Sequence, residues 1–272
     1  IASANDTFDI IDYSLNEARQ NRKNSIVFAS TDILEKRRRE IEITQAVSNA
    51  IINSSFKVYF QPIYSLKEKR YTKMEALVRL IDENLGFIPP DEFIPIAEKN
   101  GDILAIGEIV LEKVCAFIEE YHPEDYGIKS IHVNLSVVQC MQENIGIRLL
   151  NIIDKYKIPH GLIDFEITES TADNSSENLD KIMDDFNKKG IDFSLDDYGT
   201  GYSNQSNLMR YPYSIVKIDK SLVWACDSNP KAFISLKHTI AMIKDLDMKV
   251  LAEGVETQHH IDLLEQIGCE FL

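Results

Sequence analysis

Residues 163–168 read IDFEIT and residues 191–197 read IDFSLDD, with an amphipathic, helix-like segment between them. Both runs are short and rich in β-branched and aromatic residues, so they predict two parallel strands joined by a helical crossover. The first run carries Glu166 and the second ends in Asp196 and Asp197. A chain that repeats this strand–helix–strand unit builds a parallel sheet covered by helices, so the unit decides the fold class.

The same alternation continues over most of the chain. The other β-rich runs are FKVYFQPI (56–63), TKMEALVRL (72–80), SIHVNLS (130–136), SIVKID (214–219), KVLAEGV (249–255) and CEFL (269–272). Helical segments are predicted at 91–119, 139–156, 176–189, 230–246 and 257–267. Only the polar SLKEKRY separates the first two runs, so we expect a hairpin with an antiparallel first strand. Eight runs with five or six helical crossovers favour a closed α/β barrel, a TIM-like (βα)8 fold, over an open sheet.

The composition limits the classes of partner. The 272 residues include 44% hydrophobic residues and carry a formal net charge of −15. So acidic a surface repels polymeric nucleic acid, but a metal ion can supply the positive charge that a small phosphorylated ligand needs. No apolar run is long enough to span a bilayer, and the four cysteines are far apart in the sequence. We therefore expect a cytoplasmic protein with reduced cysteines, no polymeric nucleic acid and no membrane contact from this segment.

The first 52 residues are expected to be separate from the barrel. DIIDYSLNEARQNRKN (9–24) predicts an amphipathic helix and SIVFA (25–29) a short strand, followed by a helix over 31–52. We interpret the basic run 36–39 in that helix as a solvated face, because glutamates surround it. The predicted domains are therefore 1–30, a linker helix at 31–52, and the barrel at 53–272.

Polar residues gather near the carboxyl ends of the predicted strands. They are Glu75, Arg79, Asn134, Glu166, Asp196, Asp197, Lys217, Glu253 and Glu256. Because side chains alternate along a strand, Asn134 and Glu166 point away from their apolar neighbours and into the barrel. The ends of barrel strands converge on one pole, which is where active sites form. We therefore expect these side chains to meet.

So many carboxylates on one face require cations, because an unpaired buried carboxylate is costly. An all-oxygen ligand set suits Mg²⁺ or Mn²⁺ rather than zinc. Asp196 and Asp197 run into the flexible GTG sequence, so the backbone can turn both carboxylates to the site, and Asp196 could bridge two metals. We interpret His132 as a hydrogen-bonded interior residue, and expect His259 and His260 to be exposed at the start of a helix.

Each of these residues has a plainer interpretation when taken alone. A single glutamate at a strand end is more often solvated or ion-paired, and an isolated Asp-Asp pair is weak evidence for a site. Lys217 could be a core lysine paired with Asp219. The conjunction decides against these alternatives, because residues suited to metal or phosphate chemistry occur at the same level on six consecutive strands.

The chain resembles the EAL-domain phosphodiesterases over about residues 50–272. The resemblance rests on MEALVRL (74–80), NLS (134–136), EITE (166–169), DDYGTGYS (196–203), KID (217–219) and AEGVE (252–256), which occur in the order and spacing of that family. It implies an α/β barrel that hydrolyses cyclic di-GMP to linear pGpG with Mg²⁺ or Mn²⁺ at a two-metal site.

The resemblance also implies roles for individual residues. Glu75, Asn134, Glu166 and Asp196 are similar to the ligands of one metal, and Asp196 and Asp197 to those of the other. Lys217 resembles the residue that holds the attacking water, Glu253 a general base, and Glu256 a supporting carboxylate. Gln61 and Arg79 resemble substrate-contacting residues, and Glu169 the glutamate that steadies the loop at 198–204.

The resemblance extends to partners. DYSLNEARQNRKNSIVFA is similar to the end of a GGDEF domain, so we expect a GGDEF domain upstream in the same polypeptide, and the family implies a homodimer. Two other functions stay open beside the enzyme: an inactive EAL domain that acts as a cyclic di-GMP receptor or regulatory module, and a structural interaction domain. The enzyme is favoured because Glu75, the Asp pair and Lys217 are all present.

Overall fold

The computed structural model describes residues 31–173, 177–200 and 205–272, and only scattered positions before residue 31. The helix predicted over 9–24 and the strand predicted over 25–29 therefore lie outside the described residues. The chain packs as two compact units. The first contains the described residues up to Ser55 together with Leu80–Asp102, and the second contains Phe56–Arg79 and Ile103–Leu272.

The first unit is built on the helix α2, Thr31–Ile52, which confirms the helix predicted at 31–52. Arg37, Arg38 and Arg39 of its basic run pair with glutamates, as expected for a charged solvated face. The strand β3, Gly86–Ile88, pairs antiparallel with the end of the preceding strand. The helix α3, Pro90–Asn100, ends at Gly101, whose φ of 83° lies in the left-handed region that favours glycine.

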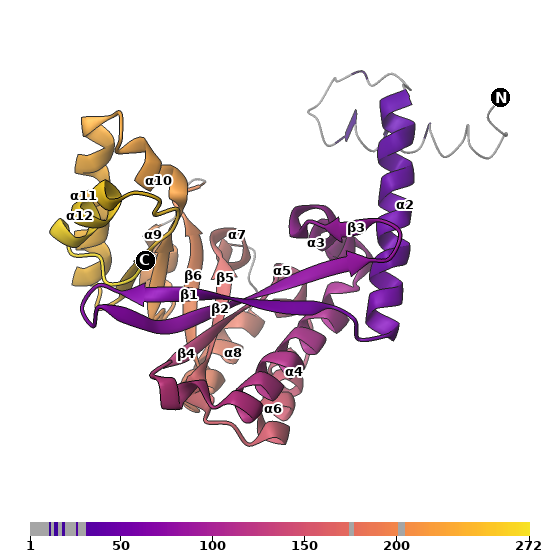
Figure 1. Ribbon diagram of the computed structural model, residues 1–272, viewed down its shortest axis with the longest axis horizontal. Coiled ribbons are helices and arrows are strands. Elements are labelled where there is room, and N and C mark those ends of the chain that lie inside the picture. The colour runs from indigo at the N-terminus through magenta and orange to yellow at the C-terminus, as the bar shows by residue number, and fades with distance from the viewer. Residues whose placement is uncertain are drawn as a thin grey trace. The chain divides into compact units, whose positions relative to one another are not determined.

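The second unit is a sheet of successive strands wrapped towards a ring (Figure 1). Its strands are β1 (Lys57–Ser65), β2 (Arg70–Asp82), β4 (Ser130–Asn134), β5 (Ile163–Thr168), β6 (Asp192–Tyr198), β7 (Ile215–Ile218) and β8 (Lys249–Ala252). β1 runs antiparallel to β2, and each later neighbour is parallel, which confirms the predicted barrel with its antiparallel first strand.

The run CEFL (269–272) joins the two edges of this sheet. Leu272 exchanges two backbone hydrogen bonds with Tyr64 of β1, at 2.9 and 3.0 Å. Phe271 exchanges backbone bonds with β8, donating to Val250 and accepting from Ala252, both at 3.0 Å. The predicted eighth run is therefore present as isolated bridges rather than a regular strand, and it pairs with both edge strands.

Helices cover the outer face of the parallel strands (Figure 1). They are α4 (Ile103–Tyr121), α5 (Val137–Cys140), α6 (Ile145–Tyr156), α7 (Glu169–Asp173), α8 (Glu177–Asn187), α9 (Gln205–Arg210), α10 (Lys220–Ala225), α11 (Pro230–Asp245) and α12 (Gln258–Gln266), with 3-10 turns at Pro123–Tyr126 and His160–Leu162. The prediction of one helical segment at 91–119 is wrong, because Gly101 separates α3 from α4. The prediction of one helical segment at 139–156 is also wrong, because the non-helical residues 141–144 separate α5 from α6. The short helices α7, α9 and α10 were not predicted, because one or two turns show no periodicity. Within the described part of the chain, no helix is long and apolar enough to cross a bilayer.

The two faces of the strands differ in character. Outward-facing Phe165 and Phe193 pack against Phe186 of α8, with ring centroids 5.5 to 5.9 Å apart. Inside the barrel, Ile63, Ile215, Leu251 and Phe271 form a buried apolar cluster contributed by β1, β7, β8 and the CEFL segment. Two residues after Ile63, Ile215 or Leu251, or two before, the same strand face carries Gln61 in β1, Lys217 in β7 and Glu253 directly after β8. The apolar cluster therefore supports the polar pole of the barrel from below.

Candidate functional site

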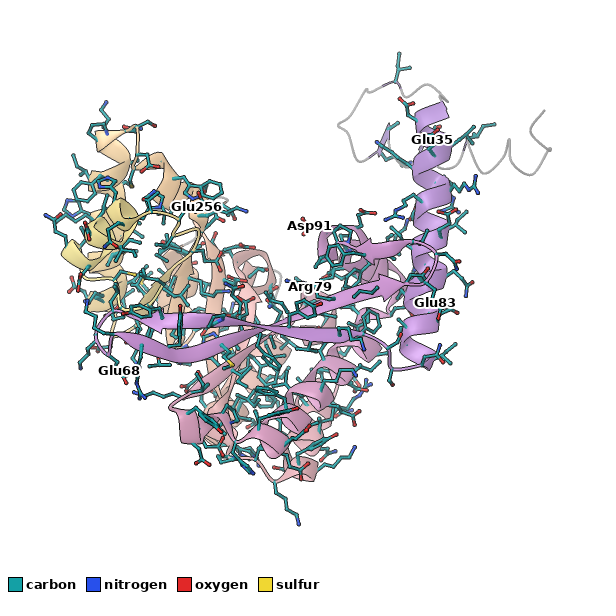
Figure 2. The ribbon with its side chains drawn as sticks, viewed as in Figure 1. Glu35, Glu68, Arg79, Glu83, Asp91 and Glu256 are labelled. Carbon is teal, nitrogen blue, oxygen red and sulfur yellow. The ribbon has the colours of Figure 1, made fainter. Side chains whose placement is uncertain are left out.

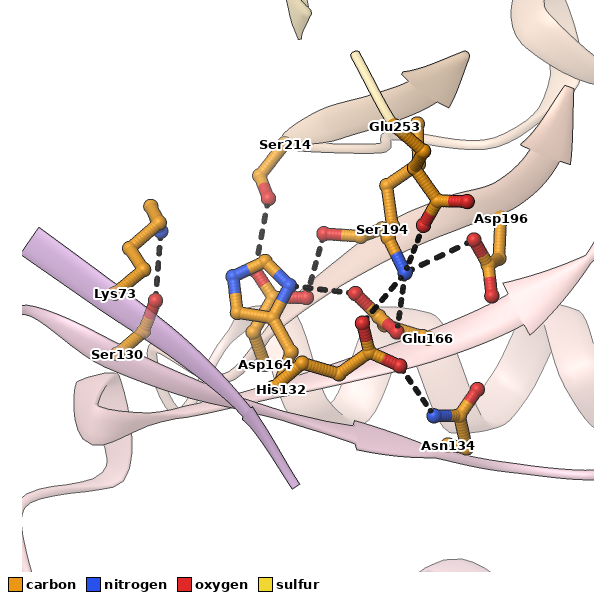
Figure 3. A network of polar contacts seen from close by, with 12 residues as sticks. Lys73, Ser130, His132, Asn134, Asp164, Glu166, Ser194, Asp196, Ser214 and Glu253 are labelled. Atoms are coloured by element: carbon orange, nitrogen blue, oxygen red, sulfur yellow. Dashed lines mark hydrogen bonds and ion pairs between the residues drawn. The ribbon is translucent and has the colours of Figure 1, made fainter. Parts of the chain in front are cut away.

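Four carboxylates from four strands or strand ends surround the ammonium group of Lys217. Its Nζ lies 3.1 Å from Glu75 Oε2, 2.9 Å from Glu166 Oε2, 3.0 Å from Asp196 Oδ1 and 3.0 Å from Glu253 Oε1 (Figure 3). Only 2% of the Lys217 side chain is exposed. An ammonium group has three N–H donors, so it cannot donate a hydrogen bond to all four carboxylates at once. The cluster therefore depends on charge as well as on hydrogen bonding.

This arrangement also excludes the plainer interpretation of Lys217 as a core lysine paired with Asp219. Asp219 is not its partner, because the Asp219 side chain caps the start of α10 by accepting the backbone N–H of Ser221 at 2.9 Å. Asn134 completes the group at the strand ends by donating from Nδ2 to Glu75 Oε1 at 3.0 Å. This bond leaves the Asn134 amide oxygen as the atom that could ligate a cation.

Burial and charge act in opposite directions on these groups. Burial raises the pKa of Glu166 to about 7, although the Lys217 charge opposes the rise. Burial also raises the pKa of Glu75, but the Lys217 charge and the hydrogen bonds from Asn134 and Lys217 outweigh it, so the net pKa is below its ordinary value. Burial lowers the pKa of Lys217, but the four carboxylates raise it well above its ordinary value. The lysine therefore stays charged and acts as the fixed cation of the site.

Asp196 and Asp197 turn to the same side of the chain despite being neighbours in sequence. The pairing of β6 with β7 shifts register between Leu195 and Tyr198, and Asp197 has a φ of 56°. The backbone N–H of Asp197 donates to Asp196 Oδ1 at 3.0 Å. An irregularity of this kind breaks the alternation of a strand, so consecutive side chains can face one site. Carboxylate oxygens of Asp196, Asp197 and Glu253 lie within 4.8 Å of one another.

The segment that carries Glu253 and Glu256 is held by two helices. Gly254 has a φ of 66°, and its carbonyl accepts a hydrogen bond from the Trp224 indole of α10 at 2.8 Å. The backbone N–H of Glu256 donates to His260 Nδ1 at 3.3 Å, and His260 Nε2 lies 3.0 Å from Asp227 Oδ1.

The prediction that His260 is exposed is therefore wrong, while the exposure of His259 is confirmed. His260 is only 3% exposed, because Asp227 and the Glu256 backbone satisfy both ring nitrogens and so permit its burial. The side chain of Glu256 is exposed in the segment between β8 and α12 (Figure 2).

A cavity of about 810 Å³ opens beside the cluster, inside the second unit. Its lining includes Gln61, Glu75, Lys217, Glu253 and Glu256. Gln61 and Glu75 face each other across the β1–β2 pair, so the first strand and the cluster border the same space. The cavity is large enough for a small organic ligand.

Arg79 and Glu169 are not among the described residues that line this cavity. Arg79 shares a strand face with Glu75, and its guanidinium lies 5.7 Å from the ring centroid of Tyr59. Glu169 is the first residue of α7. Burial, and then the negative charge of Glu169, raise the pKa of Tyr198. Of the loop predicted at 198–204, residues 201–204 lie outside the described part of the chain.

The donor set fits divalent cations. Five carboxylates, those of Glu75, Glu166, Asp196, Asp197 and Glu253, gather around one ammonium, which leaves a formal excess of four negative charges. Burial and the Asp196 charge raise the pKa of Asp197, and burial raises that of Glu253 despite Lys217, as expected for carboxylates with too little positive charge nearby. Oxygen-only ligands are those that Mg²⁺ and Mn²⁺ prefer, so the residues present fit the expected metals.

Sequence reasoning missed a second set of polar residues beneath this cluster. Asp164 and Ser194 lie two positions before Glu166 and Asp196, and both are buried. Ser194 Oγ donates to Asp164 Oδ1 at 2.7 Å, and Ser214 Oγ donates to Asp164 Oδ2 at 3.1 Å (Figure 3). Their two-residue spacing from the predicted ligands was the signal that could have identified them.

His132 belongs to this lower layer. Its Nδ1 lies 2.8 Å from Glu166 Oε1, so its interpretation as a hydrogen-bonded interior residue is confirmed. The His132 side chain is fully buried, which agrees with a supporting role rather than direct contact with solvent or ligand.

Relatives match nearly the whole chain. The chain is 31% identical over 261 residues to the signaling protein YkoW of Bacillus subtilis, which covers 96% of this chain and 32% of the relative. It is 28% identical over 263 residues to MucR of Pseudomonas aeruginosa, a bifunctional diguanylate cyclase/cyclic di-GMP phosphodiesterase, covering 96% of this chain and 38% of the relative. The chain thus spans about a third of the length of these curated relatives.

A solved structure of the PaMucR phosphodiesterase in complex with c-di-GMP has the same fold. Its TM-score is 0.79 at 28% sequence identity, and the match covers 85% of this chain and 94% of the other. The sequence profile of the EAL domain matches residues 44–272, which includes every strand of the barrel and all the carboxylates around Lys217. The chain therefore belongs to the EAL domain family.

Proposed function

We propose that this chain is a metal-dependent phosphodiesterase that hydrolyses cyclic di-GMP to linear pGpG in bacterial second-messenger signalling. The observation that carries the proposal is the Lys217 ammonium within 3.1 Å of four carboxylates at the barrel pole, beside a cavity. The relatives named as cyclic di-GMP phosphodiesterases support the choice of substrate.

The proposed ligands are Glu75, Asn134, Glu166 and Asp196 for one cation and Asp196 with Asp197 for the second. Two bound Mg²⁺ or Mn²⁺ ions would lower the pKa of water and neutralise charge that develops on the phosphate. The excess negative charge of the carboxylates supports this ligand set, because two divalent ions would balance it.

The chain's own residues have distinct parts in the proposed reaction. Lys217 orients the attacking water by donating an N–H, and Glu253 accepts a proton from that water. The raised pKa of Glu253 suits a base that must hold a proton during the reaction. The water oxygen bonds to phosphorus while the bond from phosphorus to the 3′ oxygen breaks. The 3′ oxygen takes a proton from solvent, and Glu253 then returns its proton to solvent. Gln61 and Arg79 contact the nucleotide, Glu256 supports the Glu253 segment, and Glu169 steadies the loop after the Asp pair.

The proposal also covers the neighbouring domain, the oligomeric state and the location of the protein. A GGDEF domain precedes the barrel in the same polypeptide, and the protein is a cytoplasmic homodimer. The two-domain architecture is supported by the fraction of YkoW and MucR that this chain covers, and by the cyclase named for MucR. Light scattering on a size-exclusion column tests the dimer, and a monomer at micromolar concentration would contradict it.

The test of function is incubation with cyclic di-GMP and Mn²⁺, with nucleotides followed by chromatography and binding by calorimetry. A parallel reaction contains Ca²⁺, and the Asp196→Asn variant from the same purification controls for contaminating nucleases. Conversion to pGpG by the wild-type protein alone supports the enzyme. Tight binding without conversion would identify a receptor, and neither binding nor conversion would leave an interaction domain.

A further inference from the structure

A second polar layer lies beneath the proposed metal ligands. His132, Asp164 and Ser194 occur two residues before Asn134, Glu166 and Asp196 on β4, β5 and β6, and residues two apart share a strand face. All three are at most 1% exposed. On β7 and β8 the equivalent positions are the apolar Ile215 and Leu251. The barrel interior therefore has a polar half under Glu166 and an apolar half under Lys217 and Glu253.

A buried polar layer costs free energy unless its groups bond to one another, so the contacts within it are informative. Asp164 accepts one serine hydroxyl on each oxygen, from Ser194 and Ser214, and these bonds fix its orientation. The His132 ring stands between Asp164 and Glu166. Its Nε2 is 3.9 Å from Asp164 Oδ2, too far for a hydrogen bond, whereas its Nδ1 is 2.8 Å from Glu166 Oε1 (Figure 3).

Glu166 is thus held on both oxygens by groups of different kinds. Lys217 Nζ donates to Oε2 at 2.9 Å, and His132 Nδ1 lies at Oε1. In the ionised form that would bind a cation, the Glu166 carboxylate can only accept hydrogen bonds, so the proton of the second contact belongs to His132 Nδ1. Each carboxylate oxygen has two lone pairs, so both contacts leave lone pairs for a cation.

We infer that His132 is a positioning residue whose Nδ1–H orients the Glu166 carboxylate for divalent metal, with Asp164 and its two serines holding the layer beneath. The inference rests on the proposed function, because Glu166 matters here as a metal ligand. Partners of this kind typically change metal affinity on the order of 10–100-fold when they are removed. His132 is therefore expected to set metal affinity without touching the metal or the nucleotide.

The test measures Mn²⁺ binding by calorimetry, without nucleotide, on the full chain and three variants. In His132→Asn the side-chain amide can reach the position of Nδ1, in His132→Gln it reaches that of Nε2, and His132→Leu has no donor. We expect His132→Asn to bind Mn²⁺ close to the wild-type value, and the other two to lose affinity on the order of 10–100-fold. A mere packing role predicts the opposite order, because Asn leaves the largest void and buries an amide.

Circular dichroism confirms that each variant is folded before binding is compared. Wild-type binding of Mn²⁺ with no difference among the folded variants would overturn the role of His132 but not the proposed function. Failure of the wild-type protein to bind Mn²⁺ would overturn both.

A measurement on the wild-type protein needs no variant. In ¹⁵N-edited NMR of the metal-free protein at pH 8, where Glu166 is ionised, we expect the proton of the His132 ring on Nδ1, the nitrogen that faces Glu166. An unprotonated Nδ1 would overturn the inference even if every variant failed to fold.

Discussion

The Lys217 ammonium and the Glu166 carboxylate lie 2.9 Å apart inside the barrel, with 2% and 0% of their side chains exposed. Neither group has bulk water to solvate its charge, so each depends on the other. Glu166 nevertheless keeps a pKa raised to about 7, because burial outweighs one shared lysine. The site around this pair therefore has too little positive charge for its carboxylates.

Replacing Lys217 with methionine keeps most of the length of the side chain but removes its charge. Lys217→Met leaves four carboxylates without their shared cation, so we expect the metal-free protein to lose about 3–5 kcal/mol of stability at pH 8. Urea denaturation in EDTA measures this loss, and turnover should disappear with it. Lys237→Met, at an exposed position on α11, is the control and should stay within about 0.5 kcal/mol of wild type. Equal stability of both variants would contradict the central role of Lys217.

The stability of the metal-free protein should fall as pH rises from 5 to 7. The pKa of Glu166 is about 7 when folded against an ordinary 4.5, so between these values the folded state holds a proton that the unfolded state has lost. The stabilisation that this bound proton gives to the folded state is fully present below pH 4.5 and is lost by pH 7. It amounts to at most about 3 kcal/mol at 1.36 kcal/mol per pKa unit. Urea midpoints at several pH values measure the slope. Glu166→Gln should flatten it, and an unchanged slope in that variant would assign the effect elsewhere.

Asp196→Asn should reduce phosphodiesterase turnover to near the detection limit. The amide keeps the shape of the carboxylate and can still accept the Asp197 N–H, but it loses the charge that faces Lys217 and the proposed bridging position between metals. Asp192→Asn, at the opposite end of β6, is the matched control and should retain activity. Wild-type rates in Asp196→Asn would rule out the two-metal mechanism.

Gly254→Ala should damage the site more than Gly190→Ala. Both glycines have positive φ, at 66° and 82°, so both substitutions carry a backbone cost of about 1 kcal/mol. A Cβ on Gly190 meets nothing within 4 Å, whereas one on Gly254 would lie 2.4 Å from Lys220 Cβ and 3.0 Å from Trp224 Nε1. The Glu253 segment must therefore shift, so kcat/KM should fall in Gly254→Ala alone. Similar kcat/KM values for the two variants would show that the segment tolerates displacement.

Phe271→Ala should destabilise the closed barrel. The ring is 8% exposed and packs with Ile63, Ile215 and Leu251, between the two edge strands. Loss of a buried phenylalanine costs about 3–5 kcal/mol, measured by urea denaturation. Phe87→Ala, with a ring that is 55% exposed, should cost far less. A small effect at Phe271 would mean that the CEFL segment contributes little to closure.

The sequence by itself determined the seven regular strands of the barrel, most of the long helices and the set of polar side chains that face the barrel interior, whereas the short strand β3 was not predicted. These depend on local periods: Glu166 alternates with Phe165 and Ile167, and the helix at 31–52 follows its own apolar spacing. The antiparallel first strand was also local, because a short polar turn allows no crossover. Short helices such as α7 and α10 were missed because one or two turns have no period. The breaks at Gly101 and between α5 and α6 were missed because the helical pattern continues beyond them.

Only the tertiary structure decided which partners these side chains meet. Lys217 and Asp219 are close in sequence, yet Lys217 bonds to Glu75, which is 142 residues away, once β1 and β8 are joined through the CEFL segment. His260 is buried because Asp227, from a different helical connection, reaches its ring. Alternation along a strand determines the face on which a side chain lies, but ring closure determines what it finds there. That is why the carboxylates could be predicted individually, while the central place of Lys217 and the support of Glu166 by His132 emerged from the fold.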